Sequence, residues 1–156
     1  MTMARIADIM RGRTPAARER RNARRARWQR PLATRSDRRQ AWASLLLSDH
    51  GFLRLVYRNR HKVSDRLWRS AQPAPADVGW AARNGIRTVL SVRADGFGGD
   101  LLEREACSRH GLIFQRLVML SRAAPSKEML REAMAVLPQL EVPILVHCKS
   151  GADRAG

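Results

Sequence analysis

The last ten residues contain a histidine, a cysteine and an arginine at a spacing that suits nucleophilic chemistry. Cys148 directly follows His147, and Arg154 stands six positions after the cysteine. The residues between them, 150–152, are small. A thiolate is a strong nucleophile, and a guanidinium can bind two oxygens of a phosphate group at once. The spacing therefore indicates a thiol that attacks a bound phosphoester.

The backbone of the same loop is suited to holding the phosphate. Successive N–H groups of a tightly curled loop converge on an anion, and small side chains let the backbone approach it closely. Cys148 is expected at the base of this loop, where the N–H dipoles and the Arg154 guanidinium favour the thiolate over the thiol. We therefore expect Cys148 to have a lowered pKa.

The elements that would position this loop alternate along the chain. Strands are expected at residues 63–69, 86–92, 112–120 and 142–146. Helices are expected from residue 36 with an interruption near 51, from about 75 to 84, at 100–110 with acids near its front, and from 125 onward. This alternation predicts an α/β fold, with a central mostly parallel sheet flanked by helices. The cysteine loop leaves the carboxyl end of the last strand, where open α/β sheets bind ligands.

The net charge of +16 is concentrated at the beginning of the 156 residues. Residues 1–39 contain thirteen arginines and three carboxylates. We predict a basic leader over 1–39, flexible or marginally helical, and an α/β domain over 40–156. A hydrophobic content of 44% argues against wholesale disorder, and no apolar run is long enough to span a bilayer.

The two cysteines, Cys107 and Cys148, provide neither a disulfide framework nor a zinc site. They predict a reducing, cytoplasmic location, and the sequence gives no reason to expect a metal or a cofactor. Cys107 is expected to be a small buried hydrophobic residue. A transit peptide is the weaker interpretation of the leader, because the leader is not rich in serine.

The pattern His-Cys-x-x-Gly-x-x-Arg over 147–154 resembles the signature of the cysteine-dependent protein tyrosine and dual-specificity phosphatases. Segments 69–73, 85–89 and 121–126 are similar to a bacterial dual-specificity-like branch. The resemblance covers about residues 50 to 156. It implies a protein tyrosine phosphatase-like fold and a phosphomonoester hydrolase that works through a cysteinyl-phosphate intermediate.

The resemblance also assigns roles to the loop residues. It implies that Cys148 is the nucleophile, that Arg154 binds the phosphate and that His147 modulates the thiolate. The expected substrate-binding residues are His147, Lys149, Ser150, Gly151 and Ala152. The expected substrate is a phosphorylated protein or a small acidic phosphoester. Lys149 either adds positive charge at the rim of the site or points to solvent.

Two residue types that the family usually supplies are missing. Ala155 stands where the family has a serine or threonine hydroxyl, and segment 119–126 contains no acid. Asp153 is the best candidate for the general acid, and an ion pair with a neighbouring arginine is its alternative role. A catalytically impaired phosphate-binding pseudophosphatase, and a phosphatase for non-protein phosphoesters such as phosphoinositides, therefore stay open.

The sequence ends two residues after Arg154. In the resembled fold a helix follows this loop, so we expect a fragment without its C-terminal helices and with poor activity on its own. Contact of the leader with nucleic acid or an anionic membrane also stays open, although Trp28 is its one aromatic residue. The oligomeric state is not indicated by the sequence.

Overall fold

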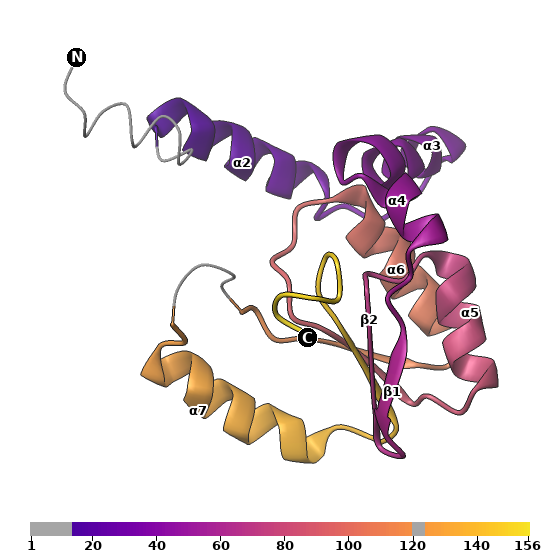
Figure 1. The fold of residues 1–156 in the computed structure, drawn as a ribbon. Coiled ribbons are helices and arrows are strands. Elements are labelled where there is room, and N and C mark those ends of the chain that lie inside the picture. Colours follow the sequence, from indigo (N-terminus) through magenta and orange to yellow (C-terminus); the bar gives the residue numbers. More distant parts are fainter. Residues whose placement is uncertain (1–13, 120–123) are drawn as a thin grey trace.

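A five-stranded sheet runs through the centre of the protein (Figure 1). The computed structural model describes residues 14–119 and 124–156. The strands are β1 (His61–Ser64), β2 (Leu67–Ser70), β3 (Thr88–Ser91), β4 (Ile113–Arg116) and β5 (Ile144–His147). Their order is β1-β2-β5-β3-β4, and each neighbouring pair is parallel except β1 with β2. The predicted α/β fold with a mostly parallel sheet is confirmed.

Helices pack on both faces of this sheet. They are α5 (Pro75–Arg83), α6 (Gly98–Arg109), α7 (Lys127–Val136) and the short 3-10 helix η2 (Leu137–Gln139). Alternate side chains of a strand point to opposite faces. Val89 and Leu145 accordingly pack with α5 and α6, whereas Leu90 and Ile144 lie in a second cluster with Ala133 of α7. The sheet is therefore buried on both sides where β3 and β5 run.

A group of helices precedes the sheet in the chain. They are α2 (Pro15–Arg27), α3 (Arg35–Ala43), the π-helix η1 (Ser44–Ser48) and α4 (Gly51–Val56). Thr34 and Asp37 form a reciprocal capping box at the start of α3. The helix predicted from residue 36 is thus present, and its interruption near Gly51 is the junction between η1 and α4, where His50 has a φ of 55°.

These first helices pack against α6. Leu32, Ala41 and Leu45 form a buried cluster with Leu102 of α6. The close approach depends on Gly98, because a Cβ atom there would lie 2.5 Å from the Cα of Ala41. The helices are therefore joined to the sheet domain through its α6 layer.

Helix α2 also contacts the loop that follows β3. The guanidinium of Arg24 lies 4.3 Å from the centre of the Phe97 ring, and Nε of Arg25 lies 3.2 Å from Oδ1 of Asp95. Residues of the basic leader thus reach the edge of the sheet from which the cysteine loop leaves.

The single strand predicted at 63–69 is wrong, because this segment is a hairpin of β1 and β2. Asp65 and Arg66 form the turn, and all four residues of β1 are exposed. An edge strand without a buried face has no apolar alternation to mark it. The strand predicted at 112–120 ends earlier, at Arg116. Position 120, the last of the predicted range, lies outside the described residues.

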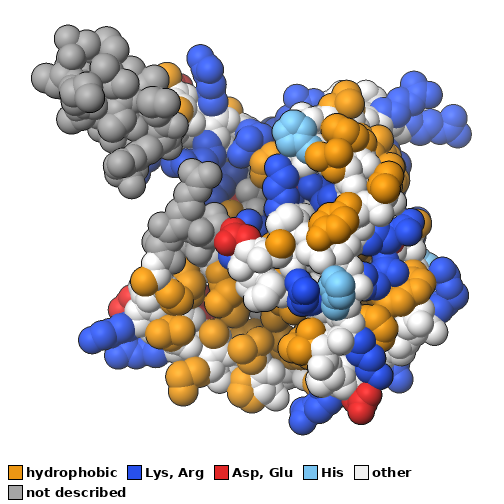
Figure 2. Space-filling view, viewed as in Figure 1, with side chains coloured by type: hydrophobic (Ala, Val, Ile, Leu, Met, Phe, Trp, Pro, Cys, Tyr) orange, Lys and Arg blue, Asp and Glu red, His pale blue; other side chains and the backbone are white. Residues whose placement is uncertain are grey.

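Apolar side chains gather on the surface over α7 (Figure 2), and they include Leu130, Met134 and Leu137. Within residues 14–119 and 124–156, no helix has both the length and the apolar character needed to cross a membrane.

We predict that Gly98→Ala lowers the free energy of unfolding by about 1–3 kcal/mol, because the added methyl group meets backbone atoms of Ala41 that cannot turn aside. Gly99→Ala is the matched control. Its added methyl group meets only the end of the Leu45 side chain, at 2.7 Å, and should cost less. Urea denaturation measures both. A Gly98→Ala protein as stable as the wild type would contradict this packing of α3 on α6.

Candidate active site

The cysteine loop begins where four neighbouring strands end together. The pairing register places Ser70 of β2 and Ser91 of β3 on either side of His147, the last residue of β5. Arg116 at the end of β4 lies beside Ser91. The carboxyl ends of parallel strands therefore converge on the base of the loop, as predicted from the alternation of elements. Figure 1 shows the loop in yellow above this edge.

The turn of the loop requires glycine at position 151. Gly151 has a φ of 74°, a conformation that side chains with a Cβ rarely adopt. A Cβ atom there would also lie 2.5 Å from the carbonyl carbon of Ser70 and 2.6 Å from the nitrogen of Ala71. The loop is thus packed directly against the backbone that follows β2.

Neighbouring segments bind the carbonyl oxygens of the loop. Arg69 donates to the carbonyl of Gly151 at 2.8 Å, and Asn59 donates to that of Ser150 at 2.9 Å. The backbone N–H of Gln72 donates to the carbonyl of Lys149 at 3.3 Å. With these carbonyls held from outside, the N–H groups of the loop are free to face inward.

Several of these N–H groups point at the sulfur of Cys148. The N–H of Gly151 donates to Sγ at 3.2 Å. Burial alone would raise the pKa of the Cys148 thiol, but the backbone hydrogen bonds outweigh burial and lower the pKa to about 7. These hydrogen bonds come from Arg154, Ala155, Asp153 and Gly151. The loop therefore already favours the negative charge of a thiolate.

Arg154, the other residue expected to bind the phosphate, directs its side chain toward the segment that follows β4. Its Nη1 donates to the carbonyl of Met119 at 3.3 Å. Its Nε is buried, and among the described residues this atom has no hydrogen-bond partner. The nearest carboxylate oxygen to Nε is that of Asp153, at 3.8 Å. Asp153 itself is half exposed, so its side chain lies at the surface of the loop.

His147 lies behind the loop. Its side chain is fully buried, and Nδ1 lies 3.1 Å from the carbonyl oxygen of Cys148. Its Nε2 lies 2.6 Å from Oε1 of Glu103, which is also fully buried. The side chain of His147 thus contacts the backbone of Cys148. The Nζ of Lys149 lies 3.4 Å from Oδ1 of Asp49, and Ser150 and Ala152 are exposed.

Sequence reasoning missed a buried polar network beneath the loop. Asp49 accepts hydrogen bonds from Arg93 at 2.7 Å and from Arg54 at 2.8 Å. Gln72 accepts from Arg93 through its oxygen, and its nitrogen donates to Glu103 at 3.0 Å. The amide of Gln72 therefore joins the arginine-aspartate cluster to the Glu103–His147 pair.

One signal in the sequence pointed to this network. Glu103 was expected to be one of the acids near the front of its helix, yet it lies one turn before Ala106 and Cys107, which belong to the buried face of α6. An acid at this spacing from buried small residues is itself on the buried face. Asp49, Arg54 and Arg93 carried no comparable signal.

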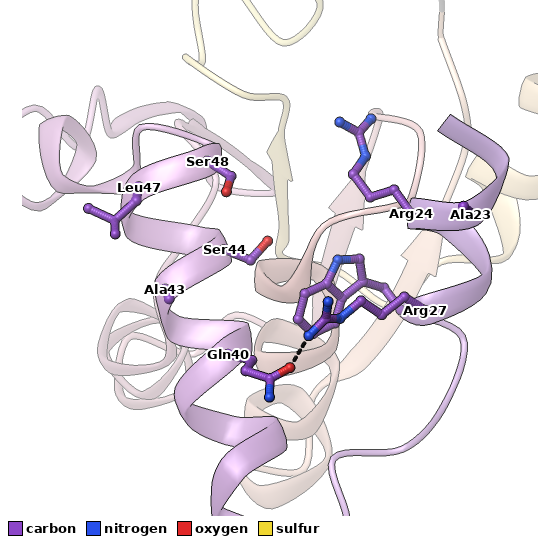
Figure 3. A pocket seen from close by; sticks show the side chains of 9 residues that line it. Ala23, Arg24, Arg27, Gln40, Ala43, Ser44, Leu47 and Ser48 are labelled. Atoms are coloured by element: carbon purple, nitrogen blue, oxygen red, sulfur yellow. Dashed lines mark hydrogen bonds between the residues drawn. The ribbon is translucent and has the colours of Figure 1, made fainter. Parts of the chain in front are cut away.

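The surface also has hollows that are not formed by the curled backbone of the cysteine loop. A recess of about 260 Å³ borders the loop at Lys149 and Ser150, and its apolar wall includes Leu53 and Tyr57. A larger cleft of about 540 Å³ lies between α2 and the α3–η1 helices, where Arg27 bonds to Gln40 (Figure 3). No residue of the cysteine loop lines this second cleft.

Within residues 14–119 and 124–156, no three histidine, cysteine or acidic side chains come together as a metal site. The segment in which the family usually carries its general acid, 119–126, lies partly outside the described residues, because 120–123 are not among them. The motif read over 121–126 is therefore described only from Ala124 onward.

The fold is that of protein tyrosine phosphatase-like enzymes. A putative phosphatase from Neisseria meningitidis Z2491 matches with a TM-score of 0.50 and 23% identity, over 58% of this chain and 66% of that chain. A putative phosphatase from Shewanella putrefaciens CN-32 matches with a TM-score of 0.52 and 18% identity, over 61% of each chain. The core catalytic domain of the PP-IP phosphatase SIW14 from S. cerevisiae matches with a TM-score of 0.51 and 19% identity, over 62% of this chain and 59% of that chain.

The family model described as "DSP-PTPase phosphatase fused to NAD+ Kinase" matches residues 55–156. The chain belongs to this family of phosphatase domains. It spans less than two thirds of the length of the solved structures named above. None of the curated proteins matches the chain.

We predict that the thiolate absorbance of Cys148 in the ultraviolet titrates with a midpoint at about pH 7. The thiolate is present above this pH and is protonated below it. Burial raises the pKa of Cys107 to about 12, so this second thiol should not contribute near neutral pH. The difference between wild-type and Cys148→Ser protein isolates the signal, and a midpoint near that of an ordinary cysteine would contradict the inward N–H groups.

Proposed function

We propose that the chain is a phosphomonoester hydrolase in which Cys148 is the nucleophile. The observation that carries this proposal is the set of loop N–H groups that converge on a thiol whose pKa is lowered to about 7. The same donors that stabilise the thiolate can bind the oxygens of a phosphate group above it. Membership of a phosphatase family supports this reading of the loop.

The reaction would proceed in two displacements. The Cys148 thiolate attacks phosphorus in line, an S–P bond forms, and the P–O bond to the leaving group breaks. The Arg154 guanidinium and the loop N–H groups bind the three remaining oxygens and stabilise their charge in the transition state. Water then attacks the cysteinyl-phosphate, which releases phosphate and returns the thiolate.

The leaving oxygen needs a proton, and we assign this proton to Asp153. Its side chain is half exposed at the surface of the loop, where a substrate must approach. Its alternative role is the contact with Arg154 Nε at 3.8 Å, which would orient the guanidinium instead. Ala155 provides no hydroxyl to assist the second displacement, so breakdown of the intermediate should be slow compared with its formation.

The surroundings of the loop favour a phosphorylated aromatic group, such as a phosphotyrosine side chain. The recess beside Ser150 presents Tyr57 and Leu53, which suit an apolar ring more than a polyol. A phosphatase for non-protein acidic phosphoesters such as phosphoinositides is the second candidate, because the core catalytic domain of the PP-IP phosphatase SIW14 has the same fold. Lys149 is half exposed and would have to leave Asp49 to bind further phosphates.

We expect Cys148→Ser to lower phosphate release from p-nitrophenyl phosphate by more than about a thousandfold, because a hydroxyl is not ionised at neutral pH. Cys107→Ser is the matched control and should keep its activity, since this thiol is buried in the core. Activity that survives Cys148→Ser would refute the mechanism. A wild-type protein that binds phosphate but releases none would support the pseudophosphatase.

We expect Asp153→Asn to lower kcat/KM for phenyl phosphate by about a hundredfold and to have much less effect on kcat/KM for p-nitrophenyl phosphate, because kcat/KM reports formation of the cysteinyl-phosphate and not its breakdown. Phenolate is a poor leaving group without a proton, whereas p-nitrophenolate leaves readily. Asp95→Asn, on the loop after β3, is the matched control and should leave the ratio of the two rates unchanged. If Asp153→Asn slows both substrates equally, the residue orients Arg154 and is not the acid.

A further inference from the structure

The pair of Glu103 and His147 is the most completely buried ionisable pair near the candidate nucleophile. Both side chains are inaccessible to solvent, and Oε1 of Glu103 lies 2.6 Å from Nε2 of His147. Neither of these two atoms has a hydrogen-bond partner within residues 14–119 and 124–156, so their close contact is the one polar approach that each of them makes there. Two acceptors at this distance would repel each other, so a proton must lie between them.

The other ring nitrogen of His147 also faces an acceptor. Nδ1 lies 3.1 Å from the carbonyl oxygen of Cys148, and a carbonyl cannot donate. Nδ1 must therefore carry a proton of its own. The proton on the opposite side of the ring is then either on Nε2, which makes His147 an imidazolium, or on Glu103, which makes both groups neutral.

Glu103 lies next to a hydrogen-bond donor and within electrostatic reach of two buried arginines. Gln72 donates to Oε2 at 3.0 Å, and Arg93 and Arg54 both experience the negative charge of Glu103. Of the other acids nearby, Asp49 is bound by the two arginines, and burial raises the pKa of Asp100 toward its neutral form.

The remaining ionisable groups around this cluster do not change the assignment. Cys107, one turn along α6, stays a neutral thiol, because burial raises its pKa to about 12. Arg116 at the end of β4 lies 3.9 Å from Asp100, and Lys149 lies 3.4 Å from Asp49. Both cations therefore contact carboxyl groups other than that of Glu103. The proton between the pair therefore belongs to the imidazole.

We infer that Glu103 is a positioning residue that holds His147 as an imidazolium behind the Cys148 thiolate. This inference rests on the proposed role of Cys148 as nucleophile. The imidazolium is the member of the pair that contacts Cys148, since Nδ1 of His147 lies 3.1 Å from the carbonyl oxygen of Cys148. Without the carboxylate, a buried imidazolium would lose its counter-ion and give up its proton. The thiolate would then lose a nearby positive charge.

The test is an ultraviolet titration of the Cys148 thiolate in the full-length protein. Glu103→Gln should raise the midpoint by roughly one pH unit, in the direction expected for loss of a nearby positive charge. His147→Asn should raise it by a similar amount, and the double variant should raise it no further than either single change. Glu105→Gln is the matched control, because Glu105 is on the same helix but is paired with Arg38 at the surface. It should leave the midpoint unchanged.

A second measurement uses the wild-type protein alone, so it does not depend on whether a variant folds. Nitrogen NMR of the wild-type protein should show both ring nitrogens of His147 protonated at neutral pH. A neutral His147, or an unchanged midpoint in folded Glu103→Gln protein, would overturn the inference. Neither readout depends on turnover. A protein that shows both signals and releases no phosphate would therefore refute the proposed function and leave the role of Glu103 standing.

Discussion

Charge that is removed from water must be paired, and this constraint governs everything beneath the cysteine loop. Asp49 is almost fully buried, and so are Arg54 and Arg93, which bind its oxygens. A buried carboxylate that loses such partners is strongly destabilising. The amide of Gln72 extends the pairing, because its oxygen faces the guanidiniums while its nitrogen faces Glu103. One polar cluster thus brings together charged groups from four separate segments of the chain.

The same cluster supports the loop from behind. His147 is held by Glu103, and the carbonyls of the loop are held by Arg69 and Asn59. The N–H groups therefore point at the sulfur before any phosphate arrives. A site whose dipoles are already oriented does not have to reorganise when negative charge develops. The sheet supplies the edge on which this arrangement stands, since β5 carries the nucleophile between β2 and β3.

The sequence was sufficient for the alternation of β3, β4 and β5 with helices and for the position of the loop. The strands β3 and β5 are short apolar runs buried on both faces, and such runs are visible in one sequence. The β1–β2 hairpin was missed because β1 has no buried face. Spacing along the chain also cannot reveal a pair such as Asp49 and Arg93, which are joined only by folding. Glu103 was hidden in a different way, because an acid near the start of a helix usually faces solvent.

The match to the phosphatase family begins at residue 55, just after both Asp49 and Arg54. The edge of the similarity therefore passes through a bidentate ion pair, with Asp49 on one side and Arg93 on the other. A domain trimmed to that edge would retain the whole loop, yet Arg93 would face the interior without the two oxygens that bind it. The segment that matches the family is thus shorter than the segment in which every residue of this buried ion pair has its partner.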